Sequence, residues 1–321
     1  PPLRLPVPAN ALDDDDWDTI VSRISNGRCT PFLGAGMSAH RLPTGRALAQ
    51  ALAEKHGYPF DDRDNLPRVA QYAAVIRNDV PRIKEQVARQ FSTATDAITA
   101  AAFADRTDPH RILADLPFAK YLTTNYDPFI ERALEAAGTP CVVDLCAWNP
   151  ATRKHVAGER VRGGGGASPT TDSDTLPLVY HLHGVQEFPE SMVLTEDDYL
   201  DFLAEIAMDP RCIRPDVSEV FAESSVLFLG YSLSDITFRV IFRIALQQLQ
   251  LNRQRAHVAV QLPPTGNSEQ IAQAIQQYLE HYLKLTMNVR FFWGTASDFT
   301  RELRTRWVKV HGDAGRTVAT P

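Results

Sequence analysis

Short apolar runs that end abruptly in small or polar residues recur along this chain. Most are rich in β-branched and aromatic residues and too short for an ordinary buried helix, which predicts buried strands. Helical patterns lie between them, and this alternation indicates an α/β fold with a mostly parallel sheet and helices on both faces. The predicted strands are residues 29–33, 120–123 and 139–143, followed by strands in LVYHLHG, SSVLFLGYSLSD, AHVAVQL and NVRFFWG.

The alternation extends over residues 13–311, which we expect to form one domain. Proline-rich residues 1–12 are predicted to be an extended tail, and 312–321 a second tail. Residues from about 60 to 106 have helical periodicity without a strand pattern, which predicts a helical insertion. Residues 150–177 contain four consecutive glycines followed by Ser, Pro, Thr and Asp, and this composition predicts a flexible loop.

Composition and charge argue against several classes of function. The formal net charge of -6 gives no reason to expect direct nucleic-acid binding. No apolar run approaches the roughly 18–20 residues that a membrane span needs. The four cysteines form no CxxC pair, so we expect no four-thiolate zinc site and no metal. Unpaired cysteines in a chain of this length favour a reducing cytoplasm.

In a parallel sheet, ligands bind outside the carboxyl ends of the strands, so the residues that follow each predicted strand deserve a close reading. The first such segment is Gly34-Ala35-Gly36-Met37-Ser38. Its glycines let the backbone approach a phosphate, and free amides can donate to it. Many ordinary strand–helix turns also carry two glycines, so this segment alone leaves both interpretations open.

Three further segments follow predicted strands. In Thr123-Thr124-Asn125-Tyr126-Asp127, helix capping explains Asp127, whereas Asn125 is not needed for a cap and can bind a sugar hydroxyl or water. In His181-Leu182-His183-Gly184, we interpret His181 as a structural histidine bonded to backbone and His183 as a general base. In Gly230-Tyr231-Ser232, the Ser232 hydroxyl can reach a phosphate or ribose.

These four segments, in this order, resemble the sirtuin superfamily: a GAG-x-S turn, then T-x-N-x-D, then H-G, then G-x-S-L. The opening CTPFLGAGMSAHRLPTGRALAQAL looks especially like the bacterial sirtuin-like NADase branch. The resemblance covers about residues 17–310. It implies a Rossmann-like fold that binds NAD⁺ as a substrate.

The resemblance also implies a role for each residue. Gly34, Ala35 and Gly36 would lie under the pyrophosphate, with Ser38 and Thr124 from the same motifs also binding NAD⁺. Asn125 and Asp127 would face the nicotinamide and its ribose, and His183 would act as the base toward the ribose hydroxyls. Gly230 and Ser232 would lie toward the adenosine.

We therefore expect an NAD⁺ glycohydrolase that releases nicotinamide and ADP-ribose as an anti-phage defence effector. Protein-deacylating sirtuins carry a four-cysteine zinc ribbon and an Asp-Phe-Arg segment after the GAG turn, and this chain has neither. An NAD-dependent deacylase and a non-catalytic NAD⁺- or ADP-ribose-binding scaffold remain as alternatives. The resemblance and the chain length together suggest a homo-oligomer with a separate partner, such as a HerA-type ATPase.

Overall fold

The computed structural model describes residues 12–162, 176–231, 256–263 and 269–313. Within them, seven strands form one sheet in the order β3-β4-β2-β1-β5-β6-β7, and every neighbouring pair is parallel. The predicted parallel α/β fold is confirmed, although the third strand begins at Val142 rather than at residue 139. The strands are β1 (Cys29–Leu33), β2 (Lys120–Thr123), β3 (Val142–Leu145), β4 (Leu178–His181), β5 (Ser225–Leu229), β6 (His257–Gln261) and β7 (Val289–Trp293).

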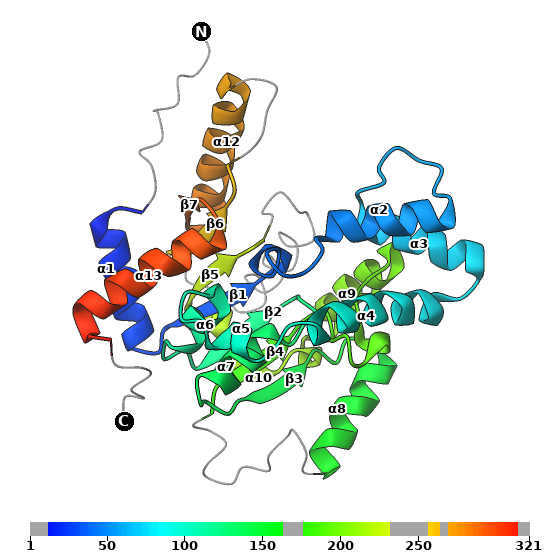
Figure 1. The fold of residues 1–321 in the computed structure, drawn as a ribbon, viewed down its shortest axis with the longest axis horizontal. Coiled ribbons are helices and arrows are strands. Elements are labelled where there is room, and N and C mark those ends of the chain that lie inside the picture. The colour runs from blue at the N-terminus through cyan, green and yellow to red at the C-terminus, as the bar shows by residue number, and fades with distance from the viewer. Residues whose placement is uncertain (1–11, 163–175, 232–255, 264–268, 314–321) are drawn as a thin grey trace.

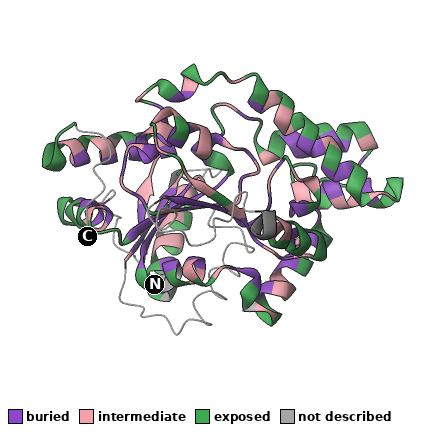
Figure 2. Ribbon diagram, turned by 90° about the horizontal axis from the view of Figure 1, so that it is seen from below, coloured by how far each residue is buried: buried purple, intermediate pink, exposed green. Residues whose placement is uncertain are grey.

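Helices cover both faces of the sheet. One face packs on α1 (Asp14–Ser25), α6 (Pro109–Ala114), α7 (Phe129–Ala136) and α13 (Ala296–His311). The other face packs on α9 (Glu196–Met208), α10 (Pro215–Glu223) and α12 (Glu269–Met287). Figure 2 shows the buried strands between these layers. None of the helices in the described part of the chain is both long and apolar enough to span a membrane.

Strand β5 shows how its sequence serves both faces. Successive side chains of a strand point to opposite sides. Accordingly Leu227 and Leu229 join one core cluster, whereas Val226 and Phe228 join the other. A strand buried on both sides must be apolar at every position, which is why the predicted strands appear as continuous apolar runs.

A third cluster lies outside the sheet. It is formed by α2 (Gly45–His56), α3 (Leu66–Arg77) and α4 (Val80–Asp96), which pack on Met192 and Leu194. These helices lie at the opposite end of the molecule from α1 and α13 (Figure 1). With the short α5 (Ala101–Ala104), helices α3 and α4 occupy most of residues 60–106.

The expected loop over residues 150–177 is wrong in its first part, because residues 150–162 form α8 (Pro150–Arg162). The helix starts at a cap that sequence reading missed. Asn149 Oδ1 accepts from the Thr152 amide at 2.8 Å, and Pro150 takes the first helical position, where its missing amide costs nothing. Residues 163–175, which include the glycine run, lie outside the described residues.

Strand β1 has β2 on one side and β5 on the other. The chain first builds the β2 side and later crosses over to build the β5 side, so its direction of winding reverses at β1. In open α/β sheets this switch point forms the crevice in which ligands bind, at the carboxyl ends of the strands. The segments after β1, β2, β4 and β5 all belong to that edge.

Replacing Phe228 tests the core beneath this edge. Phe228 is fully buried and packs on Phe32 with ring centroids 5.6 Å apart. We expect Phe228→Ala to lower the free energy of unfolding by about 3–5 kcal/mol in urea titrations. The control Phe60→Ala, at a side chain that is 61% exposed, should cost less than about 1 kcal/mol. Similar losses in both variants would contradict the packing described here.

Candidate functional site

The glycine turn after β1 packs directly on the end of β5. The Gly34 amide donates to the Leu229 carbonyl oxygen at 2.9 Å. The Gly36 amide donates to the Gly230 carbonyl oxygen, also at 2.9 Å. A Cβ atom on Gly36 would lie 2.9 Å from the Gly230 Cα, so a larger residue would push the two segments apart. Between the glycines, Ala35 is exposed, and its amide has no acceptor in the described ranges.

Tyr231 closes the same junction. A Cβ atom on Gly34 would lie 2.6 Å from its ring, and its hydroxyl donates to Thr124 Oγ1 after β2. Gly230 has a φ of +74°, a conformation that glycine adopts without strain. Thr124 and Gly230, predicted from separate motifs, therefore meet at one junction. Ser232, the remaining predicted residue near it, lies outside the described residues.

Asn125 is held in place from the β1 side. Its Nδ2 donates to the Gly34 carbonyl oxygen at 3.1 Å and to Ser38 Oγ at 3.4 Å. Because those bonds use the amide nitrogen, the carboxamide oxygen is left for other partners. Ser38 Oγ in turn donates to Asp127 Oδ2 at 3.1 Å. The predicted residues Ser38, Asn125 and Asp127 thus form one buried hydrogen-bonded chain.

Asp127 also has the capping role expected from the sequence. Its Oδ1 accepts from the amide of Phe129, the first residue of α7, at 3.2 Å. Burial raises the pKa of this carboxyl, because the charged form loses water.

His183 packs against two aromatic side chains of α9. Its ring packs edge-on against Tyr199 and Phe202, with centroids 5.4 and 5.0 Å away. Its Nε2 is buried and lacks a hydrogen-bond partner among the residues described. Burial lowers the pKa of His183 to about 3, so the imidazole is neutral at physiological pH. A buried nitrogen without a partner is costly, which makes this atom a candidate acceptor for a ligand hydroxyl.

Strand register brings the two motifs together. Thr123 of β2 pairs with His181 of β4. Asn125 and His183 each lie two residues beyond that pair, just after the ends of the adjacent strands β2 and β4 at the carboxyl edge of the sheet. The turn after His183 is fixed by Gly184, whose φ is +82° and whose missing Cβ leaves room for Ser191.

Comparison with known proteins shows the family of the chain. The SIR2-like domain family matches residues 119–292, which is more than half of the chain. This chain belongs to the SIR2-like family. The match covers the Asn125, His183 and Gly230 segments, whereas the glycine turn after β1 precedes it.

Curated relatives share part of their length with this SIR2-like chain. NAD(+) hydrolase ThsA of Acinetobacter baumannii is 28% identical over 223 residues, 68% of this chain and 39% of the relative. NAD(+) hydrolase ThsA of Bacillus cereus is 31% identical over 209 residues, 64% of this chain and 37% of the relative. The chain therefore spans less than two fifths of each of these two relatives.

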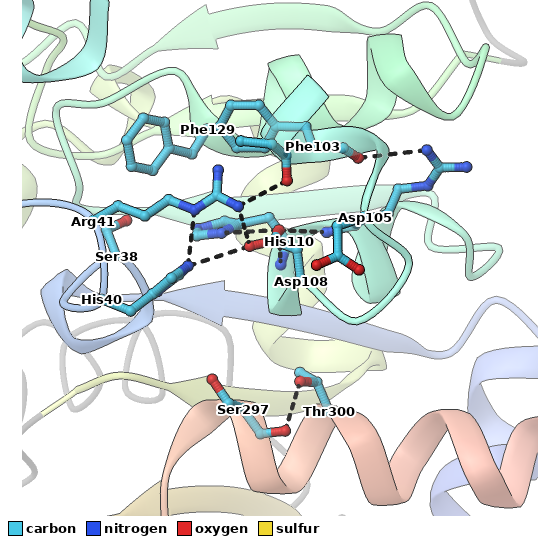
Figure 3. A network of polar contacts seen from close by, with 12 residues as sticks. Ser38, His40, Arg41, Phe103, Asp105, Asp108, His110, Phe129, Ser297 and Thr300 are labelled. Atoms are coloured by element: carbon cyan, nitrogen blue, oxygen red, sulfur yellow. Dashed lines mark hydrogen bonds and ion pairs between the residues drawn. The ribbon is translucent and has the colours of Figure 1, made fainter. Parts of the chain in front are cut away.

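The SIR2-like chain also has a polar network that sequence reading missed (Figure 3). Asp108, the N-cap of α6, accepts from Arg41 Nη2 at 2.8 Å, and His40 Nε2 lies 3.2 Å from the same carboxylate. Arg41 also lies over the Phe103 ring, 4.4 Å from its centroid. The network ties the segment after the glycine turn to α5 and α6. The Asp-Pro pair at 108–109 signals the cap, but no pattern links it to Arg41, 67 residues away.

The cysteines do not form a metal cluster in the described ranges, where no group of three or more His, Cys, Asp or Glu side chains is placed to hold an ion. Cys29 is buried in β1, and burial raises the pKa of its thiol to about 12. Cys146 and Cys212 lie close together, with Cys146 Sγ donating to the Cys212 carbonyl oxygen at 3.4 Å.

Two glycines with similar backbone angles allow the junction to be tested. Gly230 and Gly138 have φ values of +74° and +73°, but a Cβ atom collides with Met37 only at Gly230, whereas Gly138 faces open space. Gly138→Ala should lower the unfolding free energy by about 1–2 kcal/mol from backbone strain alone. Gly230→Ala should lose clearly more in the same urea titration. Equal losses would show that the end of β5 does not confine the glycine turn.

The pKa of His183 predicts a pH dependence of stability. Between about pH 6.5 and 3, the unfolded chain binds a proton that native His183 does not, so this residue lowers stability as pH falls. The contribution is at most about 1.4 kcal/mol per pH unit. We expect wild type to lose stability more steeply than His183→Gln between pH 6.5 and 4.5 in urea titrations. Parallel losses would mean that native His183 takes up a proton freely.

Proposed function

We propose that this SIR2-like chain is an NAD⁺ nucleosidase that hydrolyses NAD⁺ to nicotinamide and ADP-ribose. One observation carries the proposal. A buried carboxamide with its oxygen available lies just beyond the end of β2, and a neutral histidine whose Nε2 has no partner among the described residues lies just beyond the end of the adjacent strand β4, beside the switch point at β1. The relatives that share two thirds of the chain are named NAD(+) hydrolases, which supports the same reaction.

The glycine turn is the proposed pyrophosphate site. Ala35 and Gly36 are the exposed residues of the turn, so a phosphate could approach the Ala35 amide, which has no acceptor in the described ranges. The amides of Gly34 and Gly36 hold the turn against β5, and the absence of side chains at these glycines would let the pyrophosphate come close to the backbone. We place the adenosine side of the substrate toward Gly230 and Ser232, and Thr124 at the junction between the two halves.

The reaction breaks the bond between the ribose and nicotinamide. Nicotinamide leaves as a neutral base, and the sugar passes through a transition state resembling an oxocarbenium ion. The Asn125 oxygen would orient the attacking water or a ribose hydroxyl, because its amide nitrogen is already occupied. His183 Nε2 would accept a hydrogen bond from a ribose hydroxyl and draw its proton as charge develops. The Tyr199 and Phe202 rings beside His183 would help to exclude stray water.

The biological role is a separate proposal that rests on the family resemblance. We propose that the chain acts in the cytoplasm as an anti-phage effector that depletes NAD⁺, as a homo-oligomer with a partner such as a HerA-type ATPase. No zinc is required in this proposal, because activation of water falls to Asn125 and His183.

Substitution of the two central residues tests the reaction. Asn125→Ala and His183→Ala should each reduce nicotinamide release by about 100-fold or more, since each removes a group that acts in the transition state. Chromatography of the NAD⁺ products, with and without the genomic neighbour present, measures the effect. Circular dichroism should show an intact fold in both variants.

The matched controls Asn26→Ala and His281→Ala, at exposed side chains, should keep full activity. Full activity in the Asn125 and His183 variants would exclude the proposed mechanism. Nucleotide binding without nicotinamide release in wild type would favour the scaffold alternative. NAD⁺ consumption that depends on an acetylated peptide would favour the deacylase.

A further inference from the structure

His181 has no contact with the substrate in the proposed reaction, but it contacts the backbone of Asn125. Its ring is buried at the end of β4. Its Nδ1 lies 3.0 Å from the Asn125 carbonyl oxygen, and its Nε2 lies 2.6 Å from Glu131 Oε1 on α7. The structural role expected for His181 is therefore correct, but its backbone partner belongs to the residue at the centre of the proposed site.

Counting hydrogen-bond donors shows that this arrangement needs an additional proton. A carbonyl oxygen and an ionised carboxylate can only accept, whereas a neutral imidazole has a single N–H. Both contacts are satisfied only if the ring is an imidazolium, or if Glu131 carries the proton and donates to a neutral ring. In either case His181 and Glu131 share one proton beyond those of a neutral imidazole and a carboxylate.

We propose that His181 and Glu131 are a positioning pair, which fixes the Asn125 peptide and thereby aims its carboxamide at the substrate. The inference rests on the proposed NAD⁺ hydrolysis. Asn125 is held from two sides: its side chain by Gly34 and Ser38, and its carbonyl by His181. Fixing both leaves the carboxamide little freedom, and a reacting group that is misplaced by about 1 Å can lose 100-fold in rate.

The surroundings favour retention of the proton. Burial alone would lower the pKa of His181, but the charge and hydrogen bond of Glu131 raise it above its ordinary value. Asp127, before α7, acts in the same direction. Glu187 also faces the pair, and its own pKa is raised by burial. On the β3 side, the Cys146 amide donates to the His181 carbonyl, and burial keeps the Cys146 thiol protonated by raising its pKa.

The sign of the pH effect follows from the raised pKa. The doubly donating pair is complete below that pKa and is lost as pH rises through it. Above it, the Nε2 lone pair faces the Glu131 carboxylate, and the support of Asn125 weakens. Nicotinamide release should therefore decline on the alkaline side.

Glu131→Gln provides the decisive variant. A glutamine amide can donate to Nε2, so a neutral ring with its proton on Nδ1 satisfies both contacts at any pH. We expect activity within about threefold of wild type at pH 7, with the alkaline decline abolished. If the pair had only a structural role, Glu131→Gln would lower activity or stability but would not remove the alkaline decline in activity.

His181→Leu and His181→Asn form a matched pair of similar size. Asparagine can place an amide donor near the Nδ1 position, whereas leucine cannot. We expect kcat to fall about 10- to 100-fold in the leucine variant, with KM changed less than about threefold, and to recover largely in the asparagine variant. An equal loss of kcat in both His181 variants would overturn the proposal. An alkaline decline in activity that persists in Glu131→Gln would also overturn it.

Nuclear magnetic resonance of the imidazole nitrogens separates this inference from the proposed function. Long-range proton–nitrogen spectra of wild type should show the shared proton at His181 at pH 7, either as an imidazolium or as a ring that accepts from Glu131. In Glu131→Gln the ring should be neutral and protonated on Nδ1. A wild-type His181 protonated on Nδ1 alone beside an ionised Glu131 would overturn the pair. If wild type releases no nicotinamide, the proposed hydrolysis fails, but the spectra still show whether His181 and Glu131 share the additional proton.

Discussion

The contact between the glycine turn after β1 and the end of β5 is the constraint on which the rest of the site depends. Two backbone hydrogen bonds join these segments, from Gly34 to Leu229 and from Gly36 to Gly230. They cross the point where the direction of winding reverses, so they hold together the two halves of the sheet at its ligand-binding edge. The Gly34 carbonyl then becomes the acceptor that holds Asn125. A shift of this one turn would therefore move the proposed phosphate site and the carboxamide of Asn125 together.

The polar residues of the site are buried, and this burial both costs stability and provides the chemistry. Ser38, Asn125 and Asp127 offset the cost by bonding to one another. His181 offsets it with Glu131, whereas His183 Nε2 has no such partner in the described chain. Two histidines separated by one residue thus have opposite shifts: the pKa of His181 is raised and that of His183 is lowered. His181 is therefore suited to hold a proton, whereas His183 stays neutral and can accept a hydrogen bond at Nε2.

How much the sequence predicts depends on how local each signal is. Continuous apolar runs identify buried strands because both faces need apolar side chains, and the residues after them follow from the topology rule. Helix α8 was missed because its sequence is mainly polar and its start depends on one Asn149–Thr152 cap. The Arg41–Asp108 network depends on residues far apart in sequence, which no periodicity links. The role of the glycine turn in phosphate binding stays a prediction, and the sequence does not indicate that the Gly34 and Gly36 amides bond to β5 while the Ala35 amide has no acceptor in the described ranges.

The helical cluster outside the sheet is connected to the proposed base through α9. Lys84 of α4 is buried and donates to Asp198 Oδ1 at 2.7 Å, and the other oxygen of Asp198 accepts the Leu194 and Thr195 amides at the start of α9. The next residues of α9 include Tyr199 and Phe202, which enclose His183. Removing one partner of a buried ion pair commonly costs about 3–5 kcal/mol, because the other charge is left buried and unpaired, so loss of either residue would disturb the start of α9. The insertion therefore helps to set the burial of His183, and with it the depressed pKa that keeps the imidazole neutral.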